Sequence, residues 1–355
     1  MPVYKKKLTF YPSYGYRPEG GGEWRVPVRA WVRNERPMPP DALIRLYVDD
    51  EGELTESMML RLKEALRDFV ARDNEGEEVT FRFDGDPAGE TFRLRGRTDN
   101  DGLIIEEFVL PDETARRLLS ALGPGDEPGA LRLTAETRGW SGAATSRSTV
   151  RLIPPEGLSV VSDVDDTIKV SDITAGKRTV LRRTFLMDFE AAEGMHDRYL
   201  RILEHHPAFD NVAFHYVSGS PWQLFRLLHE FLVEKTGFPS GTFHLKSVGF
   251  NLEDLPGTFR RLRNYLRGSE YTEEMKLGEI SDILARFPRR RFVLIGDSGE
   301  RDPEVFRALK EREEFRDQIV KIYVRDVSAL GEGSDRLRDM VRIDPSGVCT
   351  QEPAD

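Results

Sequence analysis

The sequence predicts an α/β protein in two parts, a β-rich sandwich-like domain followed by a three-layer α/β domain. Its 355 residues are enough for two or three domains with cores of their own. Segments with β-branched and aromatic residues in partial alternation dominate residues 1–153. From residue 158 onward, short apolar segments alternate with amphipathic ones, which is typical of a parallel sheet covered by helices. The change of pattern follows the Pro-Pro-containing stretch RLIPPEGLSVVSD.

Residues 1–153 contain four strand-rich stretches, namely GEWRVPVRAWVRN, EEVTFRFDGD, ETFRLRGRTDNDGLIIEEFVL and ALRLTAETRGW. The TDNDG sequence in the third stretch favours a hairpin turn between two strands. Residues 54–72 break the pattern, because LTESMMLRLKEALRDFVAR places apolar residues at helical spacing behind a Thr/Ser cap. We therefore predict a sandwich-like domain over residues 1–153 with one inserted helix.

The second domain is predicted over residues 158–330. Its strand candidates, with helical segments between them, are LSVVSD, NVAFHYVSGS, TFHLKSV, RFVLIGDS and IVKIYVRDV. In a parallel sheet of this kind, sites lie beyond the carboxyl ends of the strands. Residues 331–355, which end in PSGVCTQEPAD, are predicted to form a loosely ordered C-terminal tail.

Composition argues against several classes of protein. Hydrophobic residues make up 39% and charged residues 32%, as in an ordinary soluble globular protein, and the net charge of −10 argues against bulk binding to nucleic acid. The single cysteine, Cys349, cannot build a disulfide framework or a cysteine-based zinc site. The N-terminal sequence lacks the apolar stretch of a signal peptide, and no apolar run approaches the ~18 residues of a membrane span. We expect a cytoplasmic protein.

Polar residues follow the predicted strands of the second domain in a fixed order. The stretch DVDDT begins at Asp163 directly after LSVV, and Ser218 follows NVAFHYV. Lys276 lies early in the helix that precedes the next strand, and GDSGERD after RFVLI supplies Asp297 and Asp302. A lone acidic DVDD is more often a solvated turn, but four such pieces in order indicate a site.

This set of residues suits phosphoryl transfer. A carboxylate can attack phosphorus only if its repulsion with the anionic phosphate is cancelled, and Mg²⁺ does this while orienting the substrate. Magnesium prefers oxygen ligands, so Asp163 and Asp297 from adjacent strand ends are suitable. Asp165 lies within reach of the leaving oxygen, which it can protonate before it activates water. Ser218 would hydrogen-bond a phosphoryl oxygen, and Lys276 would offset negative charge.

The order of these pieces resembles the haloacid dehalogenase superfamily, with D-x-D-x-T, then Ser/Thr, then Lys, then G-D-(x)4-D. The likeness narrows at SDVDDTIK, EGMHDRY, FHYVSGSPWQLFRLLHEFL, GFPSGTFHLK and FPRRRFVLIGDSGERDPEVF. These stretches look like the catalytic domain of the actin-patch-associated phosphatidate phosphatases and their bacterial relatives. The similarity covers roughly residues 158–325 and implies a Rossmann-like catalytic domain. It also implies Mg²⁺-dependent hydrolysis of phosphatidate, or a related lipid phosphate, to diacylglycerol and phosphate.

Matched position by position, the resemblance implies Asp163 as the nucleophile that forms an aspartyl-phosphate and Asp165 as the acid/base. Asp163 and Asp297 would be metal ligands, and Asp165 would add its backbone carbonyl. Asp302 would be either a further ligand or a hydrogen-bonding partner of one. Lys246 in FHLK competes with Lys276 for the lysine role, and we favour Lys276 because it suits a helix leading into the strand before Asp297.

Other readings stay open. Two basic stretches with apolar residues, GKRTVLRRTFLM at 176–187 and FRRLRNYLR at 259–267, could contact an anionic membrane surface, which would make the protein peripheral to the membrane. Both are equally consistent with an ordinary solvated face. The substrate could instead be a soluble or polynucleotide phosphomonoester. The chain could also be a lipid- or protein-binding adaptor with a vestigial phosphatase domain, although the intact aspartate and lysine set argues against this. The sequence leaves the oligomeric state open.

Overall fold

The structure is a computed structural model that describes residues 5–41, 54–139, 142–205, 211–247, 269–331 and 333–349. The chain forms two compact units. The first comprises Met1–Met38 and Val70–Pro155, and the second comprises Pro39–Phe69 and Glu156–Asp355.

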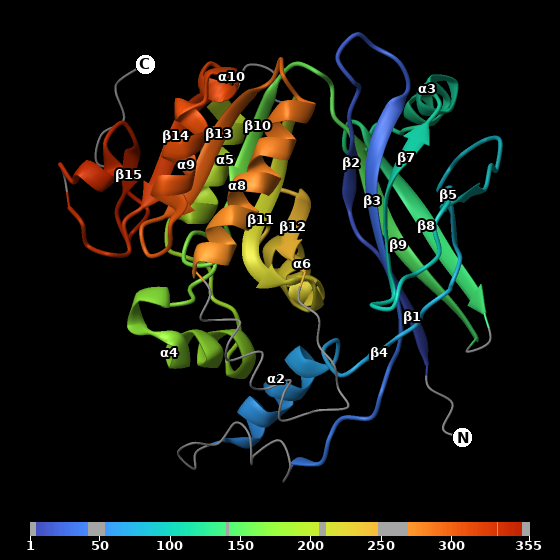
Figure 1. The fold of residues 1–355 in the computed structure, drawn as a ribbon, viewed down its shortest axis with the longest axis horizontal. Helices are drawn as coiled ribbons and strands as arrows, with labels where there is room; N and C mark the ends of the chain where they lie inside the picture. Colours follow the sequence, from blue (N-terminus) through green and yellow to red (C-terminus); the bar gives the residue numbers. More distant parts are fainter. Residues whose placement is uncertain are drawn as a thin grey trace. The chain divides into compact units, whose positions relative to one another are not determined.

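The first unit is built from two β-sheets (Figure 1). One sheet has the order β1-β3-β4, with β7 also paired to β3, and the other has the order β2-β9-β8-β5-β6. The bounds are β1 Lys6–Phe10, β2 Ser13–Gly15, β3 Trp24–Asn34, β4 Arg72–Asp73, β5 Val79–Phe83, β6 Phe92–Arg93, β7 Leu103–Leu110, α3 Asp112–Ser120, β8 Ala130–Gly139 and β9 Gly142–Leu152.

Both sheets of the first unit contribute to one hydrophobic core. Alternation along β3 turns Val28, Ala30 and Val32 inward, as expected for a strand with one buried face. Phe81 of β5 and Leu133 of β8 reach the same core from the other sheet. The prediction of a sandwich-like domain rests on the alternation of residues along these strands, and the structure shows two sheets that share a core.

The hairpin predicted at TDNDG is wrong. The turn itself is present, because the Gly102 amide donates to the Asp99 carbonyl at 3.0 Å and Asp99 Oδ1 accepts from the Leu103 amide at 2.8 Å. The flanking strands, however, pair elsewhere, β6 with β5 and β7 with β3. The local pattern indicates a turn but does not determine the partner strand, and here the chain passes from one sheet to the other.

The helix predicted within residues 54–72 is confirmed as α2, Glu56–Leu66. The Thr55 side chain caps it by accepting from the Met58 amide at 3.2 Å. This helix groups with the second unit and not with the β-rich first unit. Arg61 donates to the Met187 carbonyl at 3.1 Å, so the helix is tied to the α/β unit by its own side chains.

The second unit contains a six-stranded parallel sheet in the order β12-β11-β10-β13-β14-β15. Helices α8 and α9 pack on one face of this sheet, and α5 lies on the other face (Figure 1). The bounds are β10 Leu158–Ser162, η1 Ile173–Ala175, α4 Lys177–Leu181, η2 Arg182–Leu186, α5 Met195–His205, β11 Val212–Pro221, η4 Trp222–Leu224, α6 Phe225–His229, η5 Glu230–Lys235, β12 Thr242–Lys246, α8 Ser269–Arg286, β13 Arg291–Asp297, α9 Asp302–Glu311, α10 Glu313–Arg316, β14 Ile319–Arg325, η6 Asp335–Leu337 and β15 Val341–Ile343.

The region predicted as a loosely ordered tail is structured over residues 333–349. It contains η6, and β15 extends the sheet by pairing in parallel with β14. The apolar pattern of a three-residue strand is too short to be recognised from sequence. Across the described part of the chain, no helix is long and apolar enough to cross a membrane.

Candidate active site

The parallel sheet places the candidate residues at one edge. The central strand β10 is followed at once by Asp163, whose amide donates to the Ile295 carbonyl of β13 at 2.9 Å. The order of the strands reverses at β10, because the chain first adds β11 and β12 on one side and later β13 and β14 on the other. Such a switch point opens a crevice beyond the strand ends, where ligands bind in sheets of this kind.

Lys276 of α8 lies at the centre of the site. Its Nζ donates to Asp163 Oδ1 at 2.8 Å, to Asp302 Oδ1 at 2.6 Å and to Glu300 Oε2 at 2.9 Å. Burial disfavours a charged ammonium, but these carboxylates hold the pKa of Lys276 well above its usual value. Lys246 ends β12, and burial lowers the pKa of its ammonium. The contact of Lys276 with Asp163 therefore favours Lys276 over Lys246 as the lysine that would offset negative charge at the site.

Three buried aspartates form a cluster suited to a divalent cation. Asp163, Asp297 and Asp302 each offer one oxygen, and these oxygens lie within 4.8 Å of one another. In the described structure, Asp163 Oδ2 and Asp297 Oδ2 are buried without a hydrogen-bond partner. Burial first, then the neighbouring carboxylates, raises the pKa of Asp163 and of Asp297 well above the usual value. Unpaired oxygens and crowded negative charge are what a hard, oxygen-binding cation would relieve.

Two glycines leave room for this cluster. A Cβ at Gly296 would lie 2.5 Å from Asp302 Oδ2, and one at Gly299 would lie 2.9 Å from Asp297 Oδ1. Asp302 Oδ2 accepts from the Asp297 amide at 3.2 Å. Any side chain at either glycine would displace a carboxylate of the cluster, which explains the GDSG sequence at this loop.

Asp165 is held by four donors. Its Oδ2 accepts from Ser218 Oγ and Ser220 Oγ, both at 3.0 Å, and its Oδ1 lies 2.7 Å from both Ser171 Oγ and Lys169 Nζ. Burial alone would raise the pKa of Asp165, but the Lys169 ammonium and the serine hydroxyls hold it below its usual value. Ser218, expected to face a phosphoryl oxygen, binds Asp165 in this structure.

Asp166 supports the turn that follows Asp165. It has a positive φ of 55°. Its carboxylate accepts from the amides of Ser171 at 2.7 Å, Asp172 at 2.8 Å and Ile173 at 2.6 Å. With these three bonds Asp166 fixes the path of the chain as it leaves the site.

Sequence reasoning missed three residues at this site. Lys169 carries the signal of a cation four residues after Asp165, and Ser220 lies two residues after Ser218 on the same strand, so their side chains share a face. Glu300 sits within the GDSGERD motif itself. Each becomes apparent only when the strand ends are placed side by side.

A cavity of about 460 Å³ opens above these residues. Its polar wall includes Asp165, Lys276 and Asp302. The segment of residues 173–186, hereafter the flap, covers part of it with η1, α4 and η2. The apolar residues that line the cavity are Ile173, Val180, Phe185, Pro221, Leu224 and Val305. The cavity therefore has charged residues on one side and apolar residues on the other.

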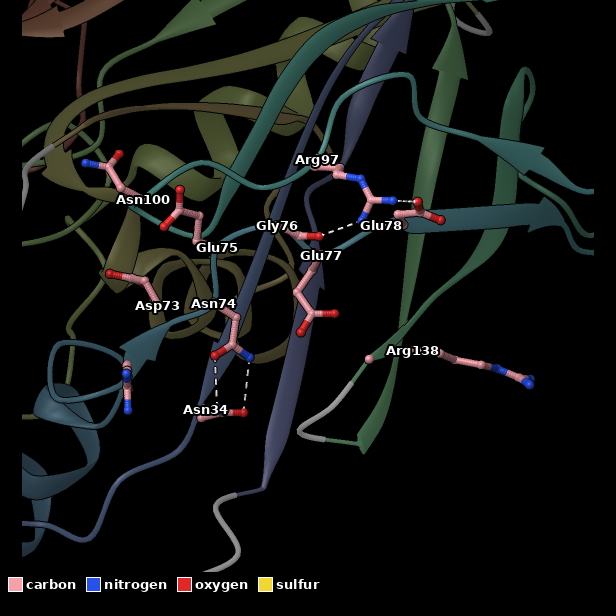
Figure 2. A pocket seen from close by; sticks show the side chains of 12 residues that line it. Asn34, Asp73, Asn74, Glu75, Gly76, Glu77, Glu78, Arg97, Asn100 and Arg138 are labelled. Carbon is pink, nitrogen blue, oxygen red and sulfur yellow. Dashed lines mark hydrogen bonds and ion pairs between the residues drawn. The ribbon is translucent and has the colours of Figure 1, made fainter.

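A larger hollow of about 720 Å³ lies in the first unit (Figure 2). Its polar groups are largely paired with one another or with nearby residues. Arg97 binds Glu78, and the amides of Asn34 and Asn74 donate to each other at 2.9 and 3.2 Å. Lys6 pairs with Glu77 at 2.6 Å. This hollow lacks the clustered, unpaired carboxylate oxygens of the second unit, so we place the candidate active site at the sheet edge.

Comparison with known proteins agrees with this placement. Residues 158–326 match the family described as "Phosphatidate phosphatase APP1, catalytic domain". The matched region begins with β10 and contains the aspartate cluster, Lys276 and the flap.

Two curated relatives match over part of their length. "Phosphatidate phosphatase APP1" of Saccharomyces cerevisiae is 31% identical over 239 residues, which cover 62% of this chain and 37% of that protein. An uncharacterized protein of Schizosaccharomyces pombe is 29% identical over 184 residues, covering 51% of this chain and 27% of that protein. The chain thus spans well under half the length of either relative. A sialyltransferase structure from Photobacterium damsela, at 9% identity and TM-score 0.19 over 70% of this chain and 37% of that one, carries no argument about the fold.

Proposed function

We propose that the second unit is a phosphatase that hydrolyses phosphatidate, or a related lipid phosphate, with the help of Mg²⁺. The observation that carries this proposal is the pairing of Asp163 with Lys276 beside the aspartate cluster, where Lys276 and Asp302 line a cavity with an apolar wall. The family match and the phosphatidate phosphatase of yeast support it. The parallel sheet and the order of motifs support placing this unit in the haloacid dehalogenase superfamily.

The residues present fit a magnesium ion. Asp163 and Asp297 would hold it with their unpaired oxygens, together with the backbone carbonyl of Asp165, and Asp302 would be a further ligand or a partner of Asp297. When bound, Mg²⁺ would neutralise charge on the phosphate and orient it for attack.

The reaction would proceed in two displacements. A carboxylate oxygen of Asp163 attacks phosphorus, the bond to the ester oxygen breaks, and Asp165 gives that oxygen a proton. Water then attacks the aspartyl-phosphate, Asp165 accepts its proton, and phosphate leaves with Asp163 restored. Lys276 offsets negative charge throughout, because its ammonium already lies beside Asp163.

Ser218 and Ser220 would link phosphate binding to the protonation of Asp165. In the described geometry both hydroxyls donate to Asp165 and favour its ionised form. An incoming phosphoryl group offers these hydroxyls other acceptors, which withdraws two donors from Asp165 and raises its affinity for a proton. Asp165 would therefore become an acid when substrate is bound.

The apolar wall of the cavity supports a lipid substrate. A small polar metabolite would gain nothing from Val180, Phe185 and Leu224, whereas the apolar part of a lipid would bury surface against them. The flap also carries the exposed Arg178 and Arg182. We propose that it touches an anionic membrane surface and that the protein is cytoplasmic and peripheral to the membrane. The other basic stretch, 259–267, lies outside the described residues.

The test is phosphate release by the purified protein with and without Mg²⁺. Phosphatidate in mixed micelles is compared with a panel of soluble phosphomonoesters, including an oligonucleotide phosphate, and Asp163→Asn is the control in each assay. We expect Mg²⁺-dependent release from phosphatidate well above the panel, and none from Asp163→Asn. Release from soluble esters alone would reject the lipid substrate. No release from any substrate by a folded protein would favour an adaptor.

A further inference from the structure

The loop of residues 298–300, after β13, is held from two sides. On one side, the amides of Gly299 and Glu300 donate to Asp297 Oδ1 at 2.5 and 3.1 Å. On the other side, the carbonyls of Ser298 and Glu300 both accept from the guanidinium of Arg336. The same three residues therefore connect Arg336 to a member of the aspartate cluster.

Arg336 also anchors the start of α9. Its Nε donates to Glu304 Oε1 at 2.7 Å and its Nη2 to Glu304 Oε2 at 3.0 Å, which is a two-pronged pair. Glu304 lies in the first turn of α9, the helix that begins with Asp302. A single side chain thus fixes both the loop after Asp297 and the helix that carries Asp302.

Among the described residues, the hydrogen bonds with Asp326 and Ser328, which follow β14, hold the beginning of this loop. Ser328 Oγ donates to the Ser298 carbonyl at 2.9 Å, and Ser298 Oγ donates to Asp326 Oδ1 at 3.1 Å. These bonds reach Ser298, whereas Arg336 reaches Glu300 as well. Arg336 lies on η6, beyond residues 158–326 that match the catalytic family.

We propose that Arg336 is a positioning residue that sets the affinity of the aspartate cluster for a divalent cation. Asp297 keeps Oδ2 available for a cation because its Oδ1 is bound by the two loop amides. Without Arg336 the Glu300 carbonyl loses the donor that Arg336 supplies, and the Ser298 carbonyl keeps only the bond from Ser328. The amide of Glu300 then moves, and the Asp297 carboxylate loses the orientation that the loop imposes. This inference deepens the proposed function and rests on it.

The test measures cation affinity without relying on turnover. The thermal unfolding midpoint is recorded against Mg²⁺ concentration for the full chain, since a ligand of the native state raises stability according to its Kd. The variants are Arg336→Gln, Arg336→Lys and Glu304→Gln. The matched control is Arg338→Gln, because Arg338 lies two residues after Arg336, is exposed and pairs with Asp335. Phosphate release against Mg²⁺ concentration is measured in parallel.

We expect Arg336→Gln to weaken the apparent Mg²⁺ affinity at least tenfold, equivalent to ~1.4 kcal/mol, with activity largely restored at saturating Mg²⁺. The Mg²⁺ affinities of Arg336→Lys and Glu304→Gln should lie between those of Arg336→Gln and the wild type, and that of Arg338→Gln should match the wild type.

A folded Arg336→Gln with wild-type Mg²⁺ affinity would overturn the inference, even if its unfolding midpoint falls in the absence of Mg²⁺. If Arg336→Gln does not fold, wild-type affinity in both milder variants would overturn it. A wild-type chain that Mg²⁺ does not stabilise would overturn the cation site of the proposed function as well.

Discussion

At the scale of single residues, the site is defined by an imbalance of charge around Lys276. One ammonium contacts the carboxylates of Asp163, Glu300 and Asp302, and Asp297 adds another carboxylate within the same buried cluster. Buried charges are stable only when they are paired and hydrogen-bonded. Burial, and after it the surplus of negative charge, raises the pKa of Asp163, and the same surplus suits the cluster to a cation.

Replacement of Lys276 by methionine should make the protein depend on a cation for stability. The change leaves three carboxylates without their common partner, and removing one member of a buried pair costs about 3–5 kcal/mol. We expect a large fall in the unfolding midpoint in EDTA and a smaller fall in Mg²⁺, because a cation in the cluster takes over part of the charge. Thermal unfolding under both conditions checks this, and an equal loss in both would contradict it.

Asp73 in the first unit allows a test of pH dependence. Burial raises its pKa to about 6, against a hydrogen bond from Trp31 Nε1 at 2.8 Å that lowers it. Since the folded pKa exceeds the unfolded one, ionisation of Asp73 lowers stability as pH rises from about 4 through 6. Asp73→Asn keeps the Oδ1 acceptor for Trp31 and removes this penalty.

We therefore expect Asp73→Asn to stabilise the protein at pH 8 by roughly 2 kcal/mol, given ~1.4 kcal/mol per pKa unit and partial exposure to water. The gain should fall towards zero as the pH drops below 4, because Asp73 is then protonated in both the folded and the unfolded protein. Urea unfolding at pH 4 and pH 8 measures it. A difference that does not change with pH would show that Asp73 does not titrate in this range.

The residues of the site could be predicted from sequence where a strand or helix of recognisable pattern carries them to the sheet edge, as with Lys276 on α8. Asp163 and Asp297 follow apolar segments directly, so parallel pairing alone predicts that they meet. The partners of Asp165 could not be predicted in this way. Ser218 is predicted to hydrogen-bond a phosphoryl oxygen of the substrate. Its bond to Asp165 in this structure depends on side-chain rotamers, which the sequence does not determine.

At the scale of elements, the flap combines an inner and an outer face. Val180 and Thr184 line the cavity at a spacing of four residues. Arg178 and Arg182, also four apart, are exposed. In a helical segment these pairs lie on different sides. The flap can therefore hold substrate with one face and attract an anionic surface with the other.

Removal of the outer arginines should weaken binding to anionic vesicles. We expect Arg178→Ala/Arg182→Ala to bind phosphatidate-containing vesicles roughly tenfold or more weakly at low salt, since a basic residue near such a surface contributes ~1 kcal/mol. Activity on a soluble phosphomonoester should be unchanged, because neither arginine lines the cavity. Sedimentation with vesicles in EDTA, which prevents turnover, measures the binding.

The matched control is Arg289→Ala/Arg291→Ala. These exposed arginines lie at the start of β13, at the end of the strand remote from Asp297. The control removes the same charge from the opposite edge of the sheet. If both double variants lose binding equally, net charge and not the flap governs the attraction.

Element types were more predictable than their partners. Alternating strands and helices after residue 158 were confirmed because buried parallel strands such as β10 are continuous apolar runs. The hairpin at TDNDG failed, and α2 grouped with the second unit, because periodicity shows which face of an element is buried but not what buries it.

At the scale of the whole molecule, the two compact units have hydrophobic cores of different construction. The core of the first unit is drawn from its two β-sheets, as in Val79 and Leu133. The core of the second unit lies between a parallel sheet and its helices, as in Val160 and Ile283. The aspartate cluster belongs to the second unit and Asp73 to the first. The stability of each unit can therefore be changed separately, by a cation in the second and by Asp73→Asn in the first.

Separate cores predict that Mg²⁺ and Asp73→Asn act on different unfolding transitions. Calorimetry of the full chain at pH 8 should show two transitions, of which Mg²⁺ raises only the one that belongs to the second unit. A ligand at a hundred times its Kd stabilises by ~2.7 kcal/mol, which corresponds to a rise of about 5–10 °C for a unit of roughly 150–250 residues. Asp73→Asn should raise only the other transition, and Lys276→Met should lower only the transition that Mg²⁺ raises. A single transition that both changes shift together would show that the two units unfold as one.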